Sequence, residues 1–121
     1  MHELSIAIKV LEIAKRGMVR QAGMELVAIH LQIGPLAGVV VESLQSAYEI
    51  ARLQSSFPDA ELRIEQTELT IDCPRCRSVQ PVVAVNDLHC RRCGELSGKI
   101  VGGRELDIIS LEVMPCPSRH A

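Results

Sequence analysis

The sequence predicts an α+β fold in which two helices pack on a small three-stranded sheet, and a cysteine-bearing ribbon interrupts that sheet. Three observations predict it. Apolar residues recur at helical spacing in two segments, they alternate at strand spacing in three others, and two Cys-x-x-Cys pairs precede the last of these strands. With 121 residues, of which 47% are hydrophobic, the chain is long enough for one packed core and a small additional unit.

The first half of the chain contains both helices. Residues 4–18 carry apolar side chains three and four positions apart, which is typical of an amphipathic helix that ends between residues 17 and 23. Residues 27–33 alternate between apolar and polar, so they predict a half-buried strand that Gly34-Pro35 ends. A second helical stripe covers residues 41–51, and it predicts a second amphipathic helix.

The later strands contain breaks in their alternation. Leu62 and Ile64 are out of phase with residues 69–71, so we expect a bulge or bend that steers the chain out of the sheet. The run at residues 106–113 has a similar slip, and we expect it to pair back onto the first sheet. The predicted domains are therefore an α+β domain at residues 1–70 and 105–121, and a ribbon at residues 71–104.

The four ribbon cysteines predict a metal site. Their two Cys-x-x-Cys pairs are separated by thirteen residues, and each pair can form a tight knuckle that aims both thiolates at one cation. Soft sulfur ligands favour zinc, with an iron–sulfur cluster as the lesser alternative, and four thiolates leave no open position for a catalytic water. We expect Gly94 to supply permissive backbone after the second knuckle, a short hairpin at residues 82–85, and metal-dependent folding. The ligands are Cys73, Cys76, Cys90 and Cys93.

Composition argues against several other functions. A net charge of −2 and an aromatic content of 2% disfavour a nucleic-acid surface that relies on charge or base stacking. The sequence shows no signal peptide and no apolar run long enough to cross a bilayer, so we expect a cytoplasmic protein without a membrane partner. Thiols stay reduced in that compartment, and five cysteines therefore indicate metal binding rather than disulfides. Four arginines flank the knuckles, and we interpret them as offsetting the negative thiolates, with phosphate contacts as the alternative. They are Arg75, Arg77, Arg91 and Arg92.

The first three residues offer a second set of metal ligands. The Met1 amine, the His2 backbone nitrogen and the His2 imidazole can close five- and six-membered chelate rings around one ion. The backbone nitrogen of Glu3 can add another ring, and such a nitrogen-rich, planar arrangement suits nickel(II) or copper(II). We interpret His30 as a residue with a surface or helix-packing role rather than a metal ligand. Weaker candidates for metal contact are His89, Cys116 and His120.

Taken together, these features resemble the HypA family, the nickel metallochaperones of hydrogenase maturation. The resemblance extends to about Met114, and it implies a two-helix, three-stranded nickel-binding domain that is interrupted by a zinc ribbon. It also implies nickel on His2 with main-chain nitrogen from His2 and Glu3, and structural zinc on the four cysteines. The motifs that carry it are Met1-His2-Glu3, Ile33-Gly34 followed by Gly38-Val39, the paired Cys-x-x-Cys, and Glu105-Leu106-Asp107-Ile108.

The resemblance implies a non-enzymatic carrier that passes nickel to a hydrogenase large-subunit precursor with help from a nickel-handling GTPase. The acceptor, hydrogenase or urease, and the oligomeric state, with a homodimer among the options, stay open. Relatives often carry an acidic residue after Gly-Val, whereas this chain has Val40 and Val41. The resemblance therefore makes Glu42, its first acid, the candidate for a side-chain oxygen ligand. The main alternative function is a zinc-ribbon module for nucleic acid or a transcription partner. A thiol oxidoreductase is a further one, and it would need an exposed thiolate of low pKa.

Overall fold

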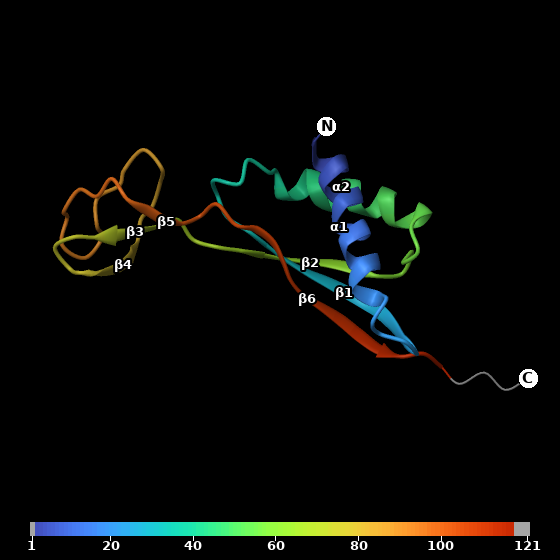
Figure 1. Cartoon of the computed structure of the whole chain (residues 1–121). Helices are drawn as coiled ribbons and strands as arrows, with labels where there is room; N and C mark the ends of the chain where they lie inside the picture. Colours follow the sequence, from blue (N-terminus) through green and yellow to red (C-terminus); the bar gives the residue numbers. More distant parts are fainter. Residues whose placement is uncertain (1, 118–121) are drawn as a thin grey trace, which may run out of the picture. The chain divides into compact units, whose positions relative to one another are not determined.

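The computed structural model describes residues 2–117 and confirms the predicted fold class (Figure 1). The chain forms two compact units, one of Met1–Leu31, Val40–Ile64 and Ile108–Ala121, the other of Gln32–Val39 and Glu65–Asp107. The predicted division at residues 71–104 stays a prediction about independent folding. The elements are α1 (His2–Met18), β1 (Met24–Ile33), α2 (Val41–Ala51), the 3₁₀ turn η1 (Arg52–Gln54), β2 (Glu61–Gln66), β3 (Thr70–Cys73), β4 (Ser78–Pro81), β5 (Ile100–Gly102) and β6 (Leu106–Pro115).

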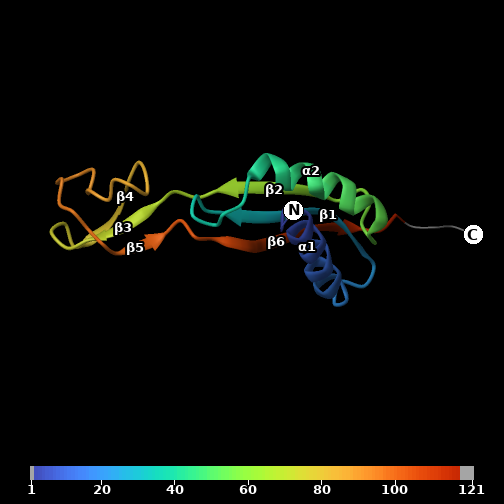
Figure 2. The ribbon, with the colours of Figure 1, turned by 90° about the horizontal axis from the view of Figure 1, so that it is seen from above.

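The first unit is a sheet covered by two helices. Its strand order is β2-β1-β6, so the last strand returns to the first sheet as predicted. Both helices lie on one face of this sheet, with α2 along β2 and α1 toward β6 (Figures 1 and 2). The Tyr48 hydroxyl of α2 donates a 2.9 Å hydrogen bond to the Ala60 carbonyl oxygen beside β2. Gly17 of α1 approaches Leu111 of β6 so closely that a Cβ built on it would lie 2.8 Å from the leucine Cδ1.

Periodic apolar residues explain why both helices form. In α1 the buried positions are spaced three and four residues apart, and Lys15 and Arg16 in its last turn complement the helix dipole. In α2 the fully buried residues are Leu44 and Tyr48, again four apart. Burial raises the pKa of Tyr48 to about 12, so this phenol stays protonated as a hydrogen-bond donor. The buried residues of α1 are Ala7, Val10, Leu11 and Ala14.

The second unit is built around the ribbon. Its sheet has the order β4-β3-β5, and β3 pairs antiparallel with both neighbours. The break in alternation after Ile64 is the place where the chain changes sheets, since Leu62 is buried in the first unit and Ile71 in the core of the second. The core of this unit is Leu69, Ile71, Cys73, Val82 and Cys90.

The hairpin expected at residues 82–85 is reduced to one antiparallel bridge around a two-residue turn, between Ala84 and Asp87. The turn between the paired strands is instead made by the first cysteine knuckle, which joins β3 to β4. Residues 82–85 form no strand, and their only ladder pairing among the described residues is a single bridge between Ala84 and Asp87. Val82 is buried but Val83 is 77% exposed, so one valine of this run anchors it and the others face water.

Glu105 links three segments of the second unit, which we call the base of that unit: the loop at Gly34, the segment at Thr67 and the turn at Gly103. The Oε1 atom of Glu105 accepts a 2.6 Å hydrogen bond from the Thr67 hydroxyl and a 2.9 Å bond from the Gly103 N–H. The Gly34 N–H donates to the Glu105 carbonyl oxygen at 2.8 Å, which fixes the loop that leads into α2. The Thr67 hydroxyl and nearby backbone N–H groups hold the pKa of Glu105 below its usual value, so the carboxylate is ionised.

Candidate metal centre

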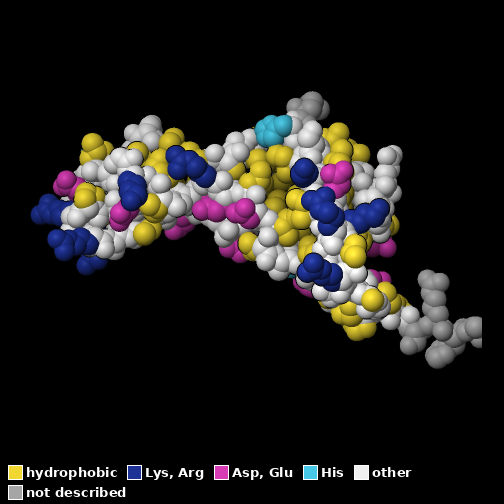
Figure 3. Space-filling view, in the orientation of Figure 1, with side chains coloured by type: hydrophobic (Ala, Val, Ile, Leu, Met, Phe, Trp, Pro, Cys, Tyr) yellow, Lys and Arg dark blue, Asp and Glu magenta, His cyan; other side chains and the backbone are white. Residues whose placement is uncertain are grey.

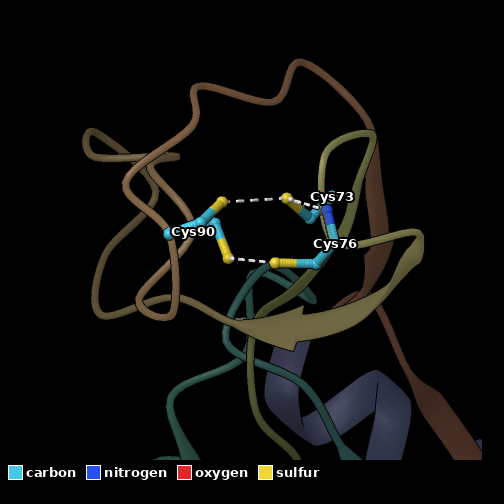
Figure 4. A group of neighbouring side chains, drawn as sticks. Cys73, Cys76 and Cys90 are labelled. Atoms are coloured by element: carbon cyan, nitrogen blue, oxygen red, sulfur yellow. Dashed lines mark hydrogen bonds between the residues drawn. The ribbon is translucent and has the colours of Figure 1, made fainter.

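The four ribbon cysteines converge on one point. Their sulfur atoms all lie within 4.8 Å of one another, and Figure 4 shows the side chains of Cys73, Cys76 and Cys90 pointing toward one another. The Sγ–Sγ distances are 3.5 Å for Cys73 and Cys93 and 3.9 Å for Cys76 and Cys90. A tetrahedron of sulfurs around zinc, with Zn–S bonds of about 2.3 Å, has edges of about 3.8 Å. The structure therefore brings the four predicted ligands together, and these two Sγ–Sγ distances lie near the edge length of a zinc tetrahedron.

The two knuckles repeat the same backbone geometry. The Arg77 N–H donates to the Cys73 carbonyl oxygen and the Gly94 N–H to the Cys90 carbonyl oxygen, both at 2.8 Å. The residue after each second cysteine is left-handed, with φ of +53° at Arg77 and +80° at Gly94. Sequence reasoning identified Gly94 but missed Arg77, although its equal position after Cys76 is the signal that could have found it. Arginine at such a φ is strained, because its Cβ crowds the backbone.

Backbone donors prepare the sulfurs for a cation. The Arg92 N–H lies 3.4 Å from the Cys90 sulfur, and the Cys76 N–H lies 3.4 Å from the Cys73 sulfur. Burial opposes ionisation of Cys90, but the backbone N–H groups of Cys93 and Arg92 outweigh it and lower the pKa to about 7. The Cys93 thiol, with burial, raises the pKa of Cys76 to about 12. The backbone N–H groups therefore favour the thiolate form of Cys90.

The donor set fits a structural metal rather than a catalytic one. All four donors are sulfur, which selects a soft cation such as zinc, and they fill the four corners of a tetrahedron without leaving a position for water. Cys73 and Cys90 are buried, whereas Cys76 and Cys93 are partly exposed. When bound, the metal would supply cross-linking of the two knuckles and no chemistry on a substrate.

Ser97 supports the second knuckle, and sequence reasoning did not identify it. Its side chain is 4% exposed, and its hydroxyl donates a 2.8 Å hydrogen bond to the Asp72 carbonyl oxygen of β3. The hydroxyl oxygen of Ser97 accepts from the Lys99 N–H at 3.2 Å, and the Ser97 N–H donates to the Leu88 carbonyl oxygen. Ser97 thus ties the segment after Cys93 to the strand that carries Cys73. A lone serine carries no spacing signal, so only the structure could show this role.

The arginines around the knuckles are exposed, and Figure 3 shows Lys and Arg side chains gathered on the surface of the ribbon-bearing unit. This exposure is compatible with both interpretations of the four residues, charge compensation for thiolates and contact with phosphates. Both stay predictions. Among the described helices, none is long and apolar enough to cross a membrane.

The predicted N-terminal ligands lie at the start of α1. His2 is the first helical residue and its side chain is 58% exposed, while Met1 lies outside the described residues. The backbone N–H groups of His2 and Glu3 belong to the first turn, where an α-helix leaves its N–H groups without intrahelical partners. A cation could therefore replace their protons without breaking the helix. The Glu3 carboxylate accepts a 3.3 Å bond from the Val40 N–H, which holds the pKa of Glu3 below its usual value.

The weaker candidates do not gather around a common point. His30 lies 3.0 Å from Glu112, and His89 lies 2.7 Å from Asp87. Glu42, which is exposed, lines a shallow hollow with Leu4. Cys116 is exposed, and His120 lies outside the described residues. Within residues 2–117 the four cysteines are the one group of three or more His, Cys, Asp or Glu side chains that is placed to share an ion.

Comparison with known proteins agrees with this architecture. A family model described as hydrogenase/urease nickel incorporation, metallochaperone, HypA matches residues 1–113. The hydrogenase maturation factor HypA of Chloroflexus aggregans is 38% identical over 112 residues, which cover 93% of this chain and 98% of that protein. The HypA of Chlorobaculum tepidum is 36% identical over 113 residues, with 93% and 99% covered. The solution structure of the Ni metallochaperone HypA from Helicobacter pylori superposes with a TM-score of 0.64 at 22% identity, covering 93% of this chain and 97% of that one.

Proposed function

This chain belongs to the HypA family of nickel-incorporation metallochaperones, and we propose that it carries nickel at its N-terminus for the maturation of a nickel-iron hydrogenase. The nickel ligands are the Met1 amine, the backbone and imidazole nitrogens of His2, and the Glu3 backbone nitrogen. A structural zinc ion occupies the four cysteines. The protein acts in the cytoplasm and catalyses no reaction. Its partners are a hydrogenase large-subunit precursor and the GTPase that handles nickel in the same pathway.

The observation that carries the proposal is the placement of His2. Its imidazole is exposed, and it stands beside backbone N–H groups that α1 does not use. Three adjacent nitrogens on two consecutive residues can form fused chelate rings, and nitrogen donors suit nickel(II) better than magnesium or calcium. A site at an exposed chain end can be approached by an acceptor and emptied one ligand at a time. A four-sulfur site in which Cys73 and Cys90 are buried is harder to empty in this way.

The experiment is a nickel titration of three untagged proteins by calorimetry. Wild type should bind about one nickel per chain, as one chelating terminus allows, whereas His2→Ala should lose most of the affinity. A one-residue N-terminal extension should do the same, because it moves the amine away from His2 and breaks the ring that they share. Zinc content should stay unchanged in all three. If the extended protein binds nickel as tightly as wild type, the metal sits elsewhere.

A further inference from the structure

Helix α2 begins without a cap of its own. Its N-cap residue is Val40, whose side chain cannot accept a hydrogen bond, and no side chain of the helix itself bonds back to it. In a capping box the residue three positions into the helix supplies that bond, but this position is Ser43, and the Val40 N–H is bound by a residue of α1 instead. The start of α2 is therefore completed by a residue 37 positions earlier in the chain.

That residue is Glu3, which follows His2 in the first turn of α1. Its Oε2 atom lies 3.3 Å from the Val40 nitrogen and 3.5 Å from the His2 Nε2 atom. The Glu3 side chain is 17% exposed, whereas that of His2 is 58% exposed. One carboxylate oxygen thus stands between the imidazole and the N-terminal end of a second helix. An anion is favourable there, because helix N-termini carry partial positive charge.

We propose that the Glu3 side chain is a positioning residue for the N-terminal nickel site, and that it acts by anchoring residues 2 and 3 to α2 through the Val40 N–H. This inference rests on the proposed function. A chain end normally frays, and a chelate formed from its own backbone must first be ordered at a cost in entropy. The anchor supplies part of that order in advance, and the carboxylate also offsets the positive helix ends that repel a cation.

The first test separates the hydrogen bond from the charge. Nickel chloride is titrated into full-length wild type, Glu3→Ala, Glu3→Gln and the control Glu12→Gln, which removes one charge from an exposed position of the same helix. Glu3→Ala should lose about 10- to 100-fold in affinity, as is usual when the support of a metal ligand is removed. Glu3→Gln should regain most of the loss because its amide oxygen can still accept from Val40, and Glu12→Gln should match wild type. If Glu3→Gln binds as weakly as Glu3→Ala, the positioning role is overturned.

The second test removes the other partner of the bond. Val40→Pro deletes the N–H but keeps the Glu3 side chain, and proline is compatible with the φ of −84° at this position. The Val40 carbonyl, which accepts from Leu44, is unaffected. Val40→Pro should weaken nickel binding as Glu3→Ala does, and the double variant should lose no more than either single one. Losses that add in the double variant overturn the proposal.

A measurement on the metal-free protein distinguishes the role of Glu3 as an anchor from the proposed nickel-carrier function. In the metal-free protein, the Val40 amide resonance should shift and exchange faster with solvent in Glu3→Ala, but not in Glu12→Gln. An unchanged Val40 amide in Glu3→Ala overturns the anchor alone. A wild-type protein that binds no nickel at its terminus overturns the proposed function, and the positioning role with it.

Discussion

Replacing Gly34 with alanine tests whether the base of the second unit is as rigid as its close approaches indicate. A Cβ built on Gly34 would lie 2.2 Å from the Gly103 carbonyl oxygen and 2.5 Å from the Glu105 Oε1 atom. The first of these is backbone, and Gly103 is held by its bond to Glu105, so it cannot rotate away. Overpacking of this kind costs typically 1–3 kcal/mol, and we expect about 3 kcal/mol because the obstructing atom is main chain.

Two other glycines provide matched controls. At Gly94 a Cβ would meet nothing within 4 Å, but the φ of +80° disfavours alanine by about 1 kcal/mol. At Gly98 the space is open and φ is not left-handed, so alanine should be neutral or stabilise by about 0.5 kcal/mol through the unfolded chain. Urea unfolding of the zinc-loaded variants, followed by circular dichroism, measures all three. If Gly34→Ala lies within about 0.5 kcal/mol of Gly98→Ala, the loop yields freely and the reasoning from close approach is refuted.

Three further predictions concern the metals and the Glu105 carboxylate. Wild type should contain about one zinc per chain. Cys73→Ser should lose this zinc and disorder the ribbon, while the helical signal in circular dichroism persists. Collapse of the whole protein would contradict the predicted domain division. Added nickel should bind without releasing zinc, as a colorimetric zinc chelator can report, because one site is nitrogen-rich and the other sulfur-rich. The pKa of Glu105 is held low in the folded state, so the stability that it contributes is present above the ordinary glutamate pKa of about 4.3 and is lost as pH falls below it. Thr67→Val removes the hydroxyl that is the main hydrogen-bond partner of Glu105. The variant's stability should therefore fall less steeply with pH in this range than that of wild type. Identical pH profiles of stability for the two proteins would show that Thr67 does not lower the pKa of Glu105.

The sequence was most informative where chemistry depends on neighbours in the chain. Cys73 and Cys76 form one knuckle because they are two residues apart, and the structure places the second pair opposite them. Helix α2 was predicted at the residues where it occurs, since its apolar stripe has a helical period. The break in alternation after Ile64 also had a local signature, and it marks the change of sheet.

Hydrogen bonds between distant segments had no such signature. The bond from the Val40 N–H to Glu3 joins residues 37 apart, and the one from Thr67 to Glu105 joins residues 38 apart. Each depends on how helices or strands pack, which a period or a spacing does not specify. The hairpin expected at residues 82–85 is only a single bridge between Ala84 and Asp87, for a related reason. Three valines in a run of four indicate a strand by propensity, but only Val82 is buried in the core of the second unit.

The two candidate sites differ in the property that decides whether a metal is kept or passed on. Cys73 is fully buried and Cys90 is 2% exposed, so a competing ligand cannot reach their sulfurs without opening the ribbon core to which they belong. The His2 imidazole is 58% exposed, and the only described side chain bonded near it is that of Glu3, which is tied to Val40. On the proposed function, an acceptor can therefore take nickel by displacing one nitrogen at a time while α1 stays folded. Releasing zinc from Cys73 and Cys90 would require the core to which they belong to open, and on the proposed function this difference in cost would let one small chain hold one metal while it delivers another.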